Sequence, residues 1–255
     1  MLPSLFISHG SPMLALEPGE SGQALQQLAA ELPRPNAIVV VSAHWESNDL
    51  RVASHPAPDT WHDFGGFPPE LFAVQYPAPG DPALAARIVQ LLAAHGMPAH
   101  LDAERPFDHG AWVPLSLMYP AADIPVVQVS LPSRLGPVAQ AEVGQALASL
   151  RSEGILLIGS GSITHNLREL NWRAGPESSE PWALAFRDWM IDKLASDDEA
   201  ALLQYRQQAP FAAKNHPSEE HLLPLYFARG AGGDFSIAHQ GWTLGALGMD
   251  IYRFG

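Results

Sequence analysis

The sequence predicts an α/β fold: a single domain, residues 1–255, with a central mixed, mostly parallel sheet flanked by helices. Two observations predict it. Strand-like and helix-like segments alternate along the chain, and three apolar runs have the composition of strands buried on both faces. Each run leads into a histidine. Leu5–Ser8 is followed by His9, the apolar run within Ala37–Trp45 is followed by His44, and Ile155–Ile158 leads through a short turn to His165.

The first two helices are indicated by their spacing and their end signals. Apolar residues recur at helical spacing over Ser21–Leu32, and prolines follow directly. The second helix starts at Asp81-Pro82, where the aspartate is a suitable N-cap and the proline a suitable first residue. It ends near His95-Gly96, where the glycine suits a C-cap and His95 can cap a carbonyl.

The later elements follow from the same patterns. A long segment of low periodicity, about 54–82, is expected to be an ordered loop rich in aromatic residues, and residues 175–180 a linker. The other expected helices are Arg134–Arg151, Pro181–Leu194 and Glu199–Gln208. The other expected strands are Ala99–Leu101, Pro125–Ser130, Phe235–His239 and Ile251–Phe254, the last two antiparallel.

Composition excludes several classes of protein. The net charge of −13, with only 14 scattered Lys and Arg, argues against a nucleic-acid partner. The chain has no cysteine, so a metal site must use His, Asp, Glu or water. The opening lacks the basic region of a signal peptide, and no apolar run is long enough to cross a membrane. We therefore expect a cytoplasmic protein with no membrane partner.

Histidines at strand ends are the main functional signal. In open α/β sheets, ligands bind beyond the carboxyl ends of the strands, and small residues beside His9 and His44 leave space there. His165 follows a Gly-Ser-Gly turn that allows close backbone approach, and Asn166 is suited to hold an imidazole tautomer. Each histidine alone could simply bond to neighbouring backbone. Together they predict a metal or acid–base site.

One further pair of histidines has a spacing that limits its role. His216 and His221 are five residues apart, about 500° around a helix, so one of them at most ligates a metal from a helix. Glu219 and Glu220 suit the first turn of a helix, although they could also be ligands, and His221 would point inward.

Asp108 and His109 form an acid–imidazole pair. The aspartate could orient a nearby imidazole, and His109 is a candidate for substrate binding or for supporting the metal site.

At this point an ordered set of motifs resembles a known family, the class III extradiol ring-cleaving dioxygenases, in the branch of the DOPA 4,5-dioxygenases. The set spans nearly the whole chain. Its members are His9-Gly10-Ser11-Pro12, Ser42-Ala43-His44-Trp45, Asp63-Phe64-Gly65-Gly66-Phe67-Pro68, Tyr76-Pro77-Ala78-Pro79-Gly80, Asp108-His109-Gly110-Ala111-Trp112, Gly159-Ser160-Gly161 with His165-Asn166-Leu167, and His216-Pro217 with His221-Leu222-Leu223-Pro224-Leu225.

The resemblance implies a role for each matched histidine. The metal ligands of the family fall on His9, His44 and His221, its acid–base histidine on His165, and a histidine that contacts substrate on His109. The implied enzyme opens the ring of a small aromatic diol such as DOPA with O₂, using Fe(II). His165 would take a hydroxyl proton and later return one, and the ordinary histidine pKa near 6.5 suits both steps.

Two alternatives stay open at this stage. The common non-haem iron site has two histidines and a carboxylate, whereas three histidines are also the zinc set of carbonic anhydrase, which favours hydrolysis. The alternatives are therefore a zinc-dependent hydrolase and a non-catalytic metal-binding protein, and Zn(II) can occupy such a site in purified protein whatever the working metal. Trp45, Trp61 and Phe107 could wall a ring. The sequence specifies neither which catechol is cleaved and where, nor the oligomeric state, nor a role for His216.

Overall fold

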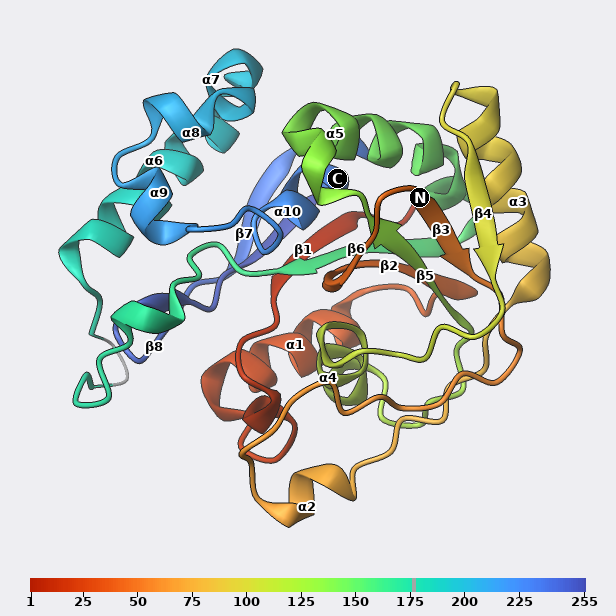
Figure 1. Ribbon diagram of the computed structural model, residues 1–255, viewed down its shortest axis with the longest axis horizontal. Coiled ribbons are helices and arrows are strands. Elements are labelled where there is room, and N and C mark those ends of the chain that lie inside the picture. The colour runs from red at the N-terminus through yellow and green to blue at the C-terminus, as the bar shows by residue number, and fades with distance from the viewer. Residues whose placement is uncertain (176–177) are drawn as a thin grey trace.

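An eight-stranded mixed sheet forms the centre of the molecule, with helices on both sides (Figure 1). The computed structural model describes residues 1–175 and 178–255. The strand order is β4-β3-β5-β2-β6-β1-β10-β7. The strands are β1 Ser4–Ser8, β2 Ala37–Glu46, β3 Leu50–Ala53, β4 Ala99–Asp102, β5 Val126–Leu131, β6 Ile155–Gly161, β7 Phe235–His239 and β10 Ile251–Phe254. This architecture confirms the predicted fold class.

The centre of the sheet is parallel and its edges are mixed. Strands β5, β2, β6 and β1 pair in parallel, as do β3 and β4. Strand β3 runs antiparallel to β5, and β10 runs antiparallel to both β1 and β7. The two last strands are therefore antiparallel, as predicted. A separate two-stranded sheet joins β8 (Trp242–Thr243) to β9 (Leu247–Gly248).

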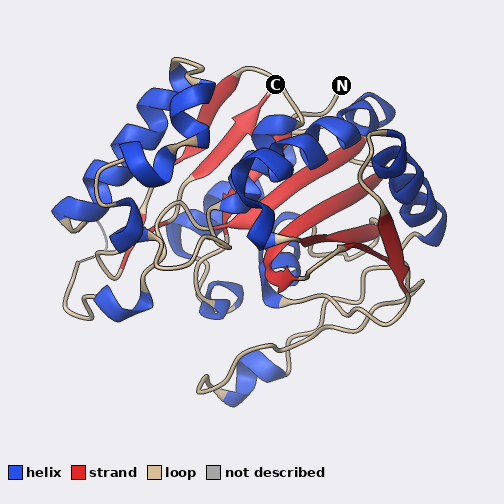
Figure 2. Cartoon of the chain, turned by 45° about the horizontal axis from the view of Figure 1, so that its top comes forward, coloured by secondary structure: helices blue, strands red, loops and turns tan. Residues whose placement is uncertain are grey.

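The central strands bury both faces, which explains their continuous apolar runs. Alternate residues of β2 enter two different cores: Val39 and Val41 face one, Ile38 and Val40 the other. The first core is completed by residues of α3, α5, α6 and α10, and the second by residues of α1 and α4. Figure 2 shows the strands between these helices.

Most predicted helices are present with small shifts in their ends. The α-helices are α1 Gly19–Glu31, α2 Pro69–Phe72, α3 Pro82–Ala94, α4 His109–Met118, α5 Gly136–Leu147, α6 Pro181–Ala195, α7 Glu199–Leu203, α8 Tyr205–Gln208, α9 Ala212–Asn215 and α10 Leu223–Gly230. Short 3₁₀ helices occupy η1 Pro12–Ala15, η2 Ser133–Leu135, η3 Ala148–Glu153 and η4 Leu167–Glu169.

Helix α3 has the predicted ends. The Asp81 side chain accepts from the Leu84 amide at 2.9 Å, and the His95 ring bonds the Leu91 carbonyl at 2.9 Å. Gly96 follows with φ of +77°, the left-handed conformation that glycine adopts without strain.

Two helices predicted as continuous are divided. Residues 134–151 form η2, α5 and η3 in succession, because Gly136, with φ of +69°, separates the first turn from the rest. Residues 199–208 divide into α7 and α8 at Gln204, whose backbone leaves the helical conformation. Apolar periodicity does not register such breaks, because they depend on the conformation of single backbone residues.

Two strands are longer than predicted, and this moves His44. Strand β2 continues to Glu46, so His44 lies inside the strand and not just past its end. Strand β6 continues through the Gly-Ser-Gly segment to Gly161. The apolar run ends earlier than the hydrogen-bonded ladder in both cases, because small polar residues still pair with their neighbours.

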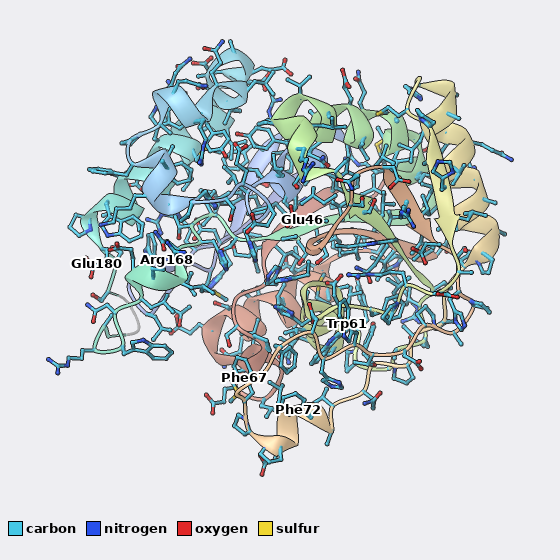
Figure 3. The ribbon with its side chains drawn as sticks, in the orientation of Figure 1. Glu46, Trp61, Phe67, Phe72, Arg168 and Glu180 are labelled. Atoms are coloured by element: carbon cyan, nitrogen blue, oxygen red, sulfur yellow. The ribbon has the colours of Figure 1, made fainter. Side chains whose placement is uncertain are left out.

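The segment 54–82 is mainly loop, as predicted, with only the short helix α2. Figure 3 labels Trp61, Phe67 and Phe72 along it, and Arg168 and Glu180 on the other side of the view. The predicted linker 175–180 includes residues 176 and 177, which lie outside the described part of the chain. Among the described residues, the structure contains no helix long and apolar enough to cross a membrane.

Candidate metal centre

Three histidines that are far apart in sequence meet at the carboxyl edge of the sheet. One ring nitrogen from each of His9, His44 and His221 lies within 4.8 Å of the others. The ring centroids are 4.9 Å apart for His9 and His44, 5.5 Å for His9 and His221, and 5.0 Å for His44 and His221. The structure therefore brings together the three residues that the sequence suggested as metal ligands.

The register of the sheet places the first two. Strands β1 and β2 flank β6 on opposite sides, and Ser160 of β6 pairs with Ile7 of β1 and with Ser42 of β2. His9 and His44 each lie two residues beyond those partners. They therefore approach each other across the end of β6.

A close backbone contact places the third. His221 lies in the turn before α10, and its carbonyl accepts from the Ser162 amide at 2.8 Å. A Cβ on Gly161 would stand 2.1 Å from that carbonyl oxygen. Only glycine at position 161 allows this approach.

Hydrogen bonds set the tautomer of His9. Its Nδ1 lies 2.9 Å from the Ser160 hydroxyl, and that hydroxyl donates to the Gly110 carbonyl. Since the hydroxyl proton is used, the serine oxygen accepts from Nδ1–H. The lone pair of His9 is therefore on Nε2.

Glu220 does the same for His221. Its carboxylate lies 2.9 Å from His221 Nδ1 and also accepts from the Ser218 hydroxyl at 3.1 Å. A carboxylate only accepts, so Nδ1 carries the proton and Nε2 the lone pair. His221 Nε2 is buried and has no hydrogen-bond partner. Glu219 and Glu220 precede α10 instead of forming its first turn, so that expectation was wrong.

The donor set fits a cation. His44 Nε2 lies 3.0 Å from His9 Nε2, and the lone pair of His221 Nε2 has no proton to accept. Imidazole nitrogens converging in a buried place are satisfied by a metal ion better than by one another. Three such nitrogens and outer acceptors on the other ring atoms are typical of histidine metal sites.

Burial keeps these imidazoles neutral. Burial, together with the neighbouring His109, lowers the pKa of His44 to about 4, although Asp108 and Asp63 oppose the shift. Burial and the other histidines also hold the pKa of His9 and of His221 well below the ordinary value. A neutral imidazole is the form that binds a metal, so the site is prepared for an ion at neutral pH.

His109 lies beside this cluster, and Asp63 of the long loop holds it. The His109–His44 ring centroids are 3.9 Å apart. Asp63 Oδ1 accepts from both the backbone amide and Nδ1 of His109, each at 2.9 Å. Burial alone would raise the pKa of Asp63, but the bonds from His109 leave it below its ordinary value. Asp63 was not singled out by sequence reasoning.

His165 stacks on His221, with ring centroids 3.5 Å apart and an interplanar angle of 6°. It therefore lies next to the three clustered histidines. Its pKa departs from the expected 6.5, since burial lowers the pKa to about 4 although Glu220 opposes this. Asn166 does not hold an imidazole, because its amide donates to the Lys214 carbonyl and accepts from the Arg168 amide.

Asp108 orients no imidazole either. It caps α4 by accepting from the Ala111 amide at 3.2 Å, and it also binds the side chains of Ser42, Arg105 and Gln128. Arg105 lies between the rings of Trp45 and Trp61, 4.9 Å from each centroid. Asp108 thus fixes the start of the helix whose first residue is His109.

The remaining candidates are structural in this arrangement. His216 is fully buried, bonds the Ile163 carbonyl at 2.9 Å and packs on Phe186. Phe107 belongs to the core, and Trp45 is also buried, whereas Trp61 is 42% exposed.

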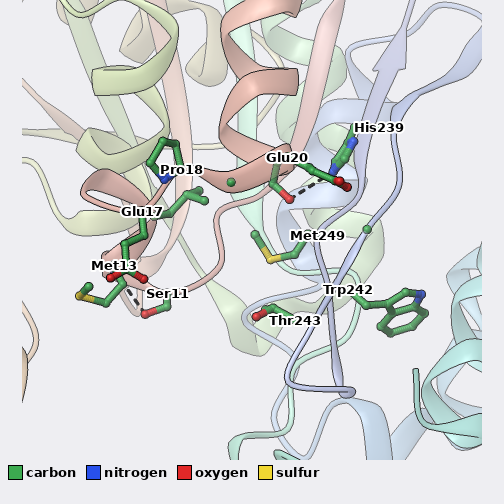
Figure 4. Close-up of a pocket in the computed structure, with 13 residues that line it drawn as sticks. Ser11, Met13, Glu17, Pro18, Glu20, His239, Trp242, Thr243 and Met249 are labelled. Atoms are coloured by element: carbon green, nitrogen blue, oxygen red, sulfur yellow. Dashed lines mark hydrogen bonds between the residues drawn. The ribbon is translucent and has the colours of Figure 1, made fainter. Parts of the chain in front are cut away.

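A cavity of about 390 Å³ lies next to the loop that carries His9 (Figure 4). Its lining comes from the start of α1 and from the residues around β7 to β9, and includes Glu17, Glu20, Trp242 and Met249. Met249 also touches Gly10. The clustered histidines do not line this cavity.

The comparisons with known proteins agree with this geometry. Residues 3–255 match the model of the family described as the catalytic LigB subunit of aromatic ring-opening dioxygenase. The chain belongs to this family.

Named relatives are similar over nearly their whole lengths. The chain is 44% identical to a 4,5-DOPA dioxygenase extradiol of Escherichia coli K12, over 100% of this chain and 95% of the relative. It is 41% identical to the Beta vulgaris protein of the same name, over 98% and 96%. A crystal structure of an uncharacterized Escherichia coli K12 protein superposes with a TM-score of 0.84 at 38% identity, covering both chains fully.

Proposed function

We propose that this LigB family enzyme is an Fe(II)-dependent extradiol dioxygenase that opens the ring of a catechol such as DOPA. One observation carries the proposal: ring nitrogens of the buried His9 and His221 and of the half-buried His44 converge, and the His165 ring stacks directly on that of His221. The names of the similar proteins support the choice of catechol.

The chain supplies the ligands and the proton-transfer groups. His9, His44 and His221 would hold Fe(II), which when bound brings the diol and O₂ together and passes electrons between them. His165 is the base for a hydroxyl proton, because its pKa of about 4 leaves it neutral at neutral pH. The protonated ring would then return the proton readily, because with a pKa of about 4 it is a stronger acid than an ordinary histidine.

Two carboxylates alter the charge expected at such a site. Asp63 lies near His44 and Glu220 is bonded to His221, so a dication there is partly balanced before any substrate enters. The site therefore favours a catechol that has lost one proton over one that has lost both, with His165 receiving that proton.

The direct test is anaerobic reconstitution with Fe(II), followed by a panel of catechols with oxygen uptake recorded. We expect one O₂ consumed for each catechol and a yellow ring-opened product, and no turnover without O₂. Turnover without O₂ by the zinc-loaded protein would favour the hydrolase instead. No turnover of any catechol by freshly loaded enzyme would leave a metal-binding protein.

The same assay tests His165. We expect His165→Ala to keep its metal and to lose turnover by roughly 10²- to 10⁴-fold, the usual contribution of a general acid–base group. If the variant keeps both metal and turnover, the acid–base role is wrong.

A further inference from the structure

A carboxylate on the long loop is placed to control the imidazole beside the metal ligands. The Asp63 side chain is only 8% exposed and the His109 side chain 9%. His109 Nδ1 bonds to Asp63, and His109 Nε2 lies on the other side of the ring. His44 Nδ1 lies 3.8 Å from Asp63 Oδ2. The Asp63 carboxylate thus lies on the Nδ1 side of both the His109 and the His44 rings.

Hydrogen bonds hold the loop that carries Asp63 in place. On its N-terminal side, the Trp61 amide donates to the Phe107 carbonyl at 2.8 Å, and the Phe107 amide donates to the Asp59 carbonyl at 2.9 Å. The Trp112 indole then donates to the Trp61 carbonyl at 2.9 Å. These bonds attach the loop to the segment just before α4 and to α4 itself.

The two bonds to Asp63 Oδ1 settle which nitrogen of His109 is protonated. Oδ1 accepts from the His109 backbone amide, so it is an acceptor in a fixed place. Nδ1 at 2.9 Å from the same oxygen must therefore donate. In a neutral imidazole this leaves the lone pair on Nε2, free to accept from a substrate hydroxyl.

We infer that Asp63 is a positioning residue which fixes the Nδ1–H tautomer of His109 and so presents Nε2 to the substrate as a hydrogen-bond acceptor. The inference rests on the proposed function for the identity of that substrate. It does not rest on it for the tautomer, which is a property of the protein alone.

The first experiment reads the tautomer without catalysis. In zinc-loaded protein labelled with ¹⁵N-histidine, long-range ¹H–¹⁵N correlation distinguishes Nδ1–H from Nε2–H for His109. We expect Nδ1–H in the parent and in Asp63→Asn, whose amide oxygen can still accept both bonds, and a change toward Nε2–H or a mixture in Asp63→Ala. An Nε2–H tautomer in the parent, or no change in Asp63→Ala, overturns the inference.

The second experiment uses a double-mutant cycle in the Fe(II)-loaded enzyme. We expect Asp63→Ala to lower kcat/KM by about 10- to 100-fold, the range for partners behind such imidazoles, and Asp63→Asn to lower it less. In a His109→Ala background, Asp63→Ala should cost little more, because its target is gone. An equal loss in both backgrounds would mean a structural role for Asp63, since the bond to the position-109 amide remains, and would overturn the inference.

Asp59→Asn is the matched control. Asp59 is an exposed carboxylate on the same loop whose backbone carbonyl, unchanged by the substitution, holds the Phe107 amide. It should leave the tautomer and kcat/KM at parent values. A parent enzyme that turns over no catechol would refute the proposed function, and the tautomer measurement would still decide the role of Asp63.

Discussion

The two sides of the candidate metal centre are built differently. His9 and His44 come from parallel strands on either side of β6, and the sheet register alone brings them together. His221, His109 and Asp63 come from a turn, a helix start and a long loop, and each depends on specific contacts to reach the site. The strand side is held by many backbone bonds, so single substitutions there change chemistry and leave position intact. The loop side is held by few, so small substitutions can move a ligand.

Loss of a loop-side ligand should have the largest effect. His221→Ala leaves two imidazoles, and we expect the variant to retain no divalent metal after dialysis, with loss of turnover, because the converging set is broken. Metal per chain, measured by mass spectrometry, is the test. His100→Ala, an exposed histidine on β4, is the control and should keep the parent stoichiometry. A fully loaded His221→Ala protein would contradict the ligand set.

The strand side allows a test of stability against pH, because the Ser8 amide at the end of β1 donates to the Asp250 carbonyl. Burial raises the pKa of Asp250 to about 6 from 3.8 in the unfolded chain, although a bond from the Tyr252 hydroxyl opposes the rise. Because the folded pKa is the higher, the stabilisation by the protonated carboxyl is complete below about pH 4. It is lost as the pH rises through 6, a change of about 3 kcal/mol.

Asp250→Asn should remove that pH dependence. We expect urea unfolding between pH 4 and 8 to show a flatter free energy for the variant, with metal affinity unchanged because the backbone bond from Ser8 to residue 250 remains. If the variant and the parent change in parallel with pH, Asp250 is not the responsible group.

A single methyl group tests how the loop side is attached. Gly161→Ala places a Cβ against the His221 carbonyl, and the overlap should cost about 1 to 3 kcal/mol of stability and move His221. We expect a lower thermal midpoint and weaker metal binding together. Gly175→Ala, where a Cβ meets open space, should change neither. Unchanged metal affinity in Gly161→Ala would show that the turn carrying His221 adjusts freely.

The smallest effect is expected from a substitution at Glu220, whose carboxylate accepts from His221 Nδ1. Glu220→Gln keeps the shape but removes the charge, and we expect the metal dissociation constant to rise by about 10- to 100-fold. Competition with a chromophoric chelator measures it. Glu219→Gln, whose carboxylate instead accepts from the Tyr205 hydroxyl, should leave the affinity at the parent value. Equal affinities for parent and Glu220→Gln would mean that His221 needs no such support.

The sequence alone predicted every strand of the main sheet except β3, together with the histidines at or near the ends of three of those strands. Apolar runs and their end signals are local properties, so β1 and β2 were predicted close to their true bounds and β6 was predicted three residues too short, with His9, His44 and His165 singled out beside them. His221 and His109 were matched through motifs of the family. The structure places both of them beside His9 and His44.

Only the tertiary structure decided which groups stand behind those imidazoles. Asp63 and His109 are 46 residues apart, and nothing in either segment specifies their pairing until the loop is attached to the start of α4. The bonds from His9 to Ser160 and from His221 to Glu220 were likewise not visible in the sequence. Ser160 lay in a recognised motif without an assigned role, and Glu220 is a residue type expected in a solvated first turn of a helix. The neutral state of the imidazoles also required the fold, since burial is what lowers their pKa. A hydrogen bond between distant side chains depends on chain path to within an ångström, and residue periodicity carries no information at that precision.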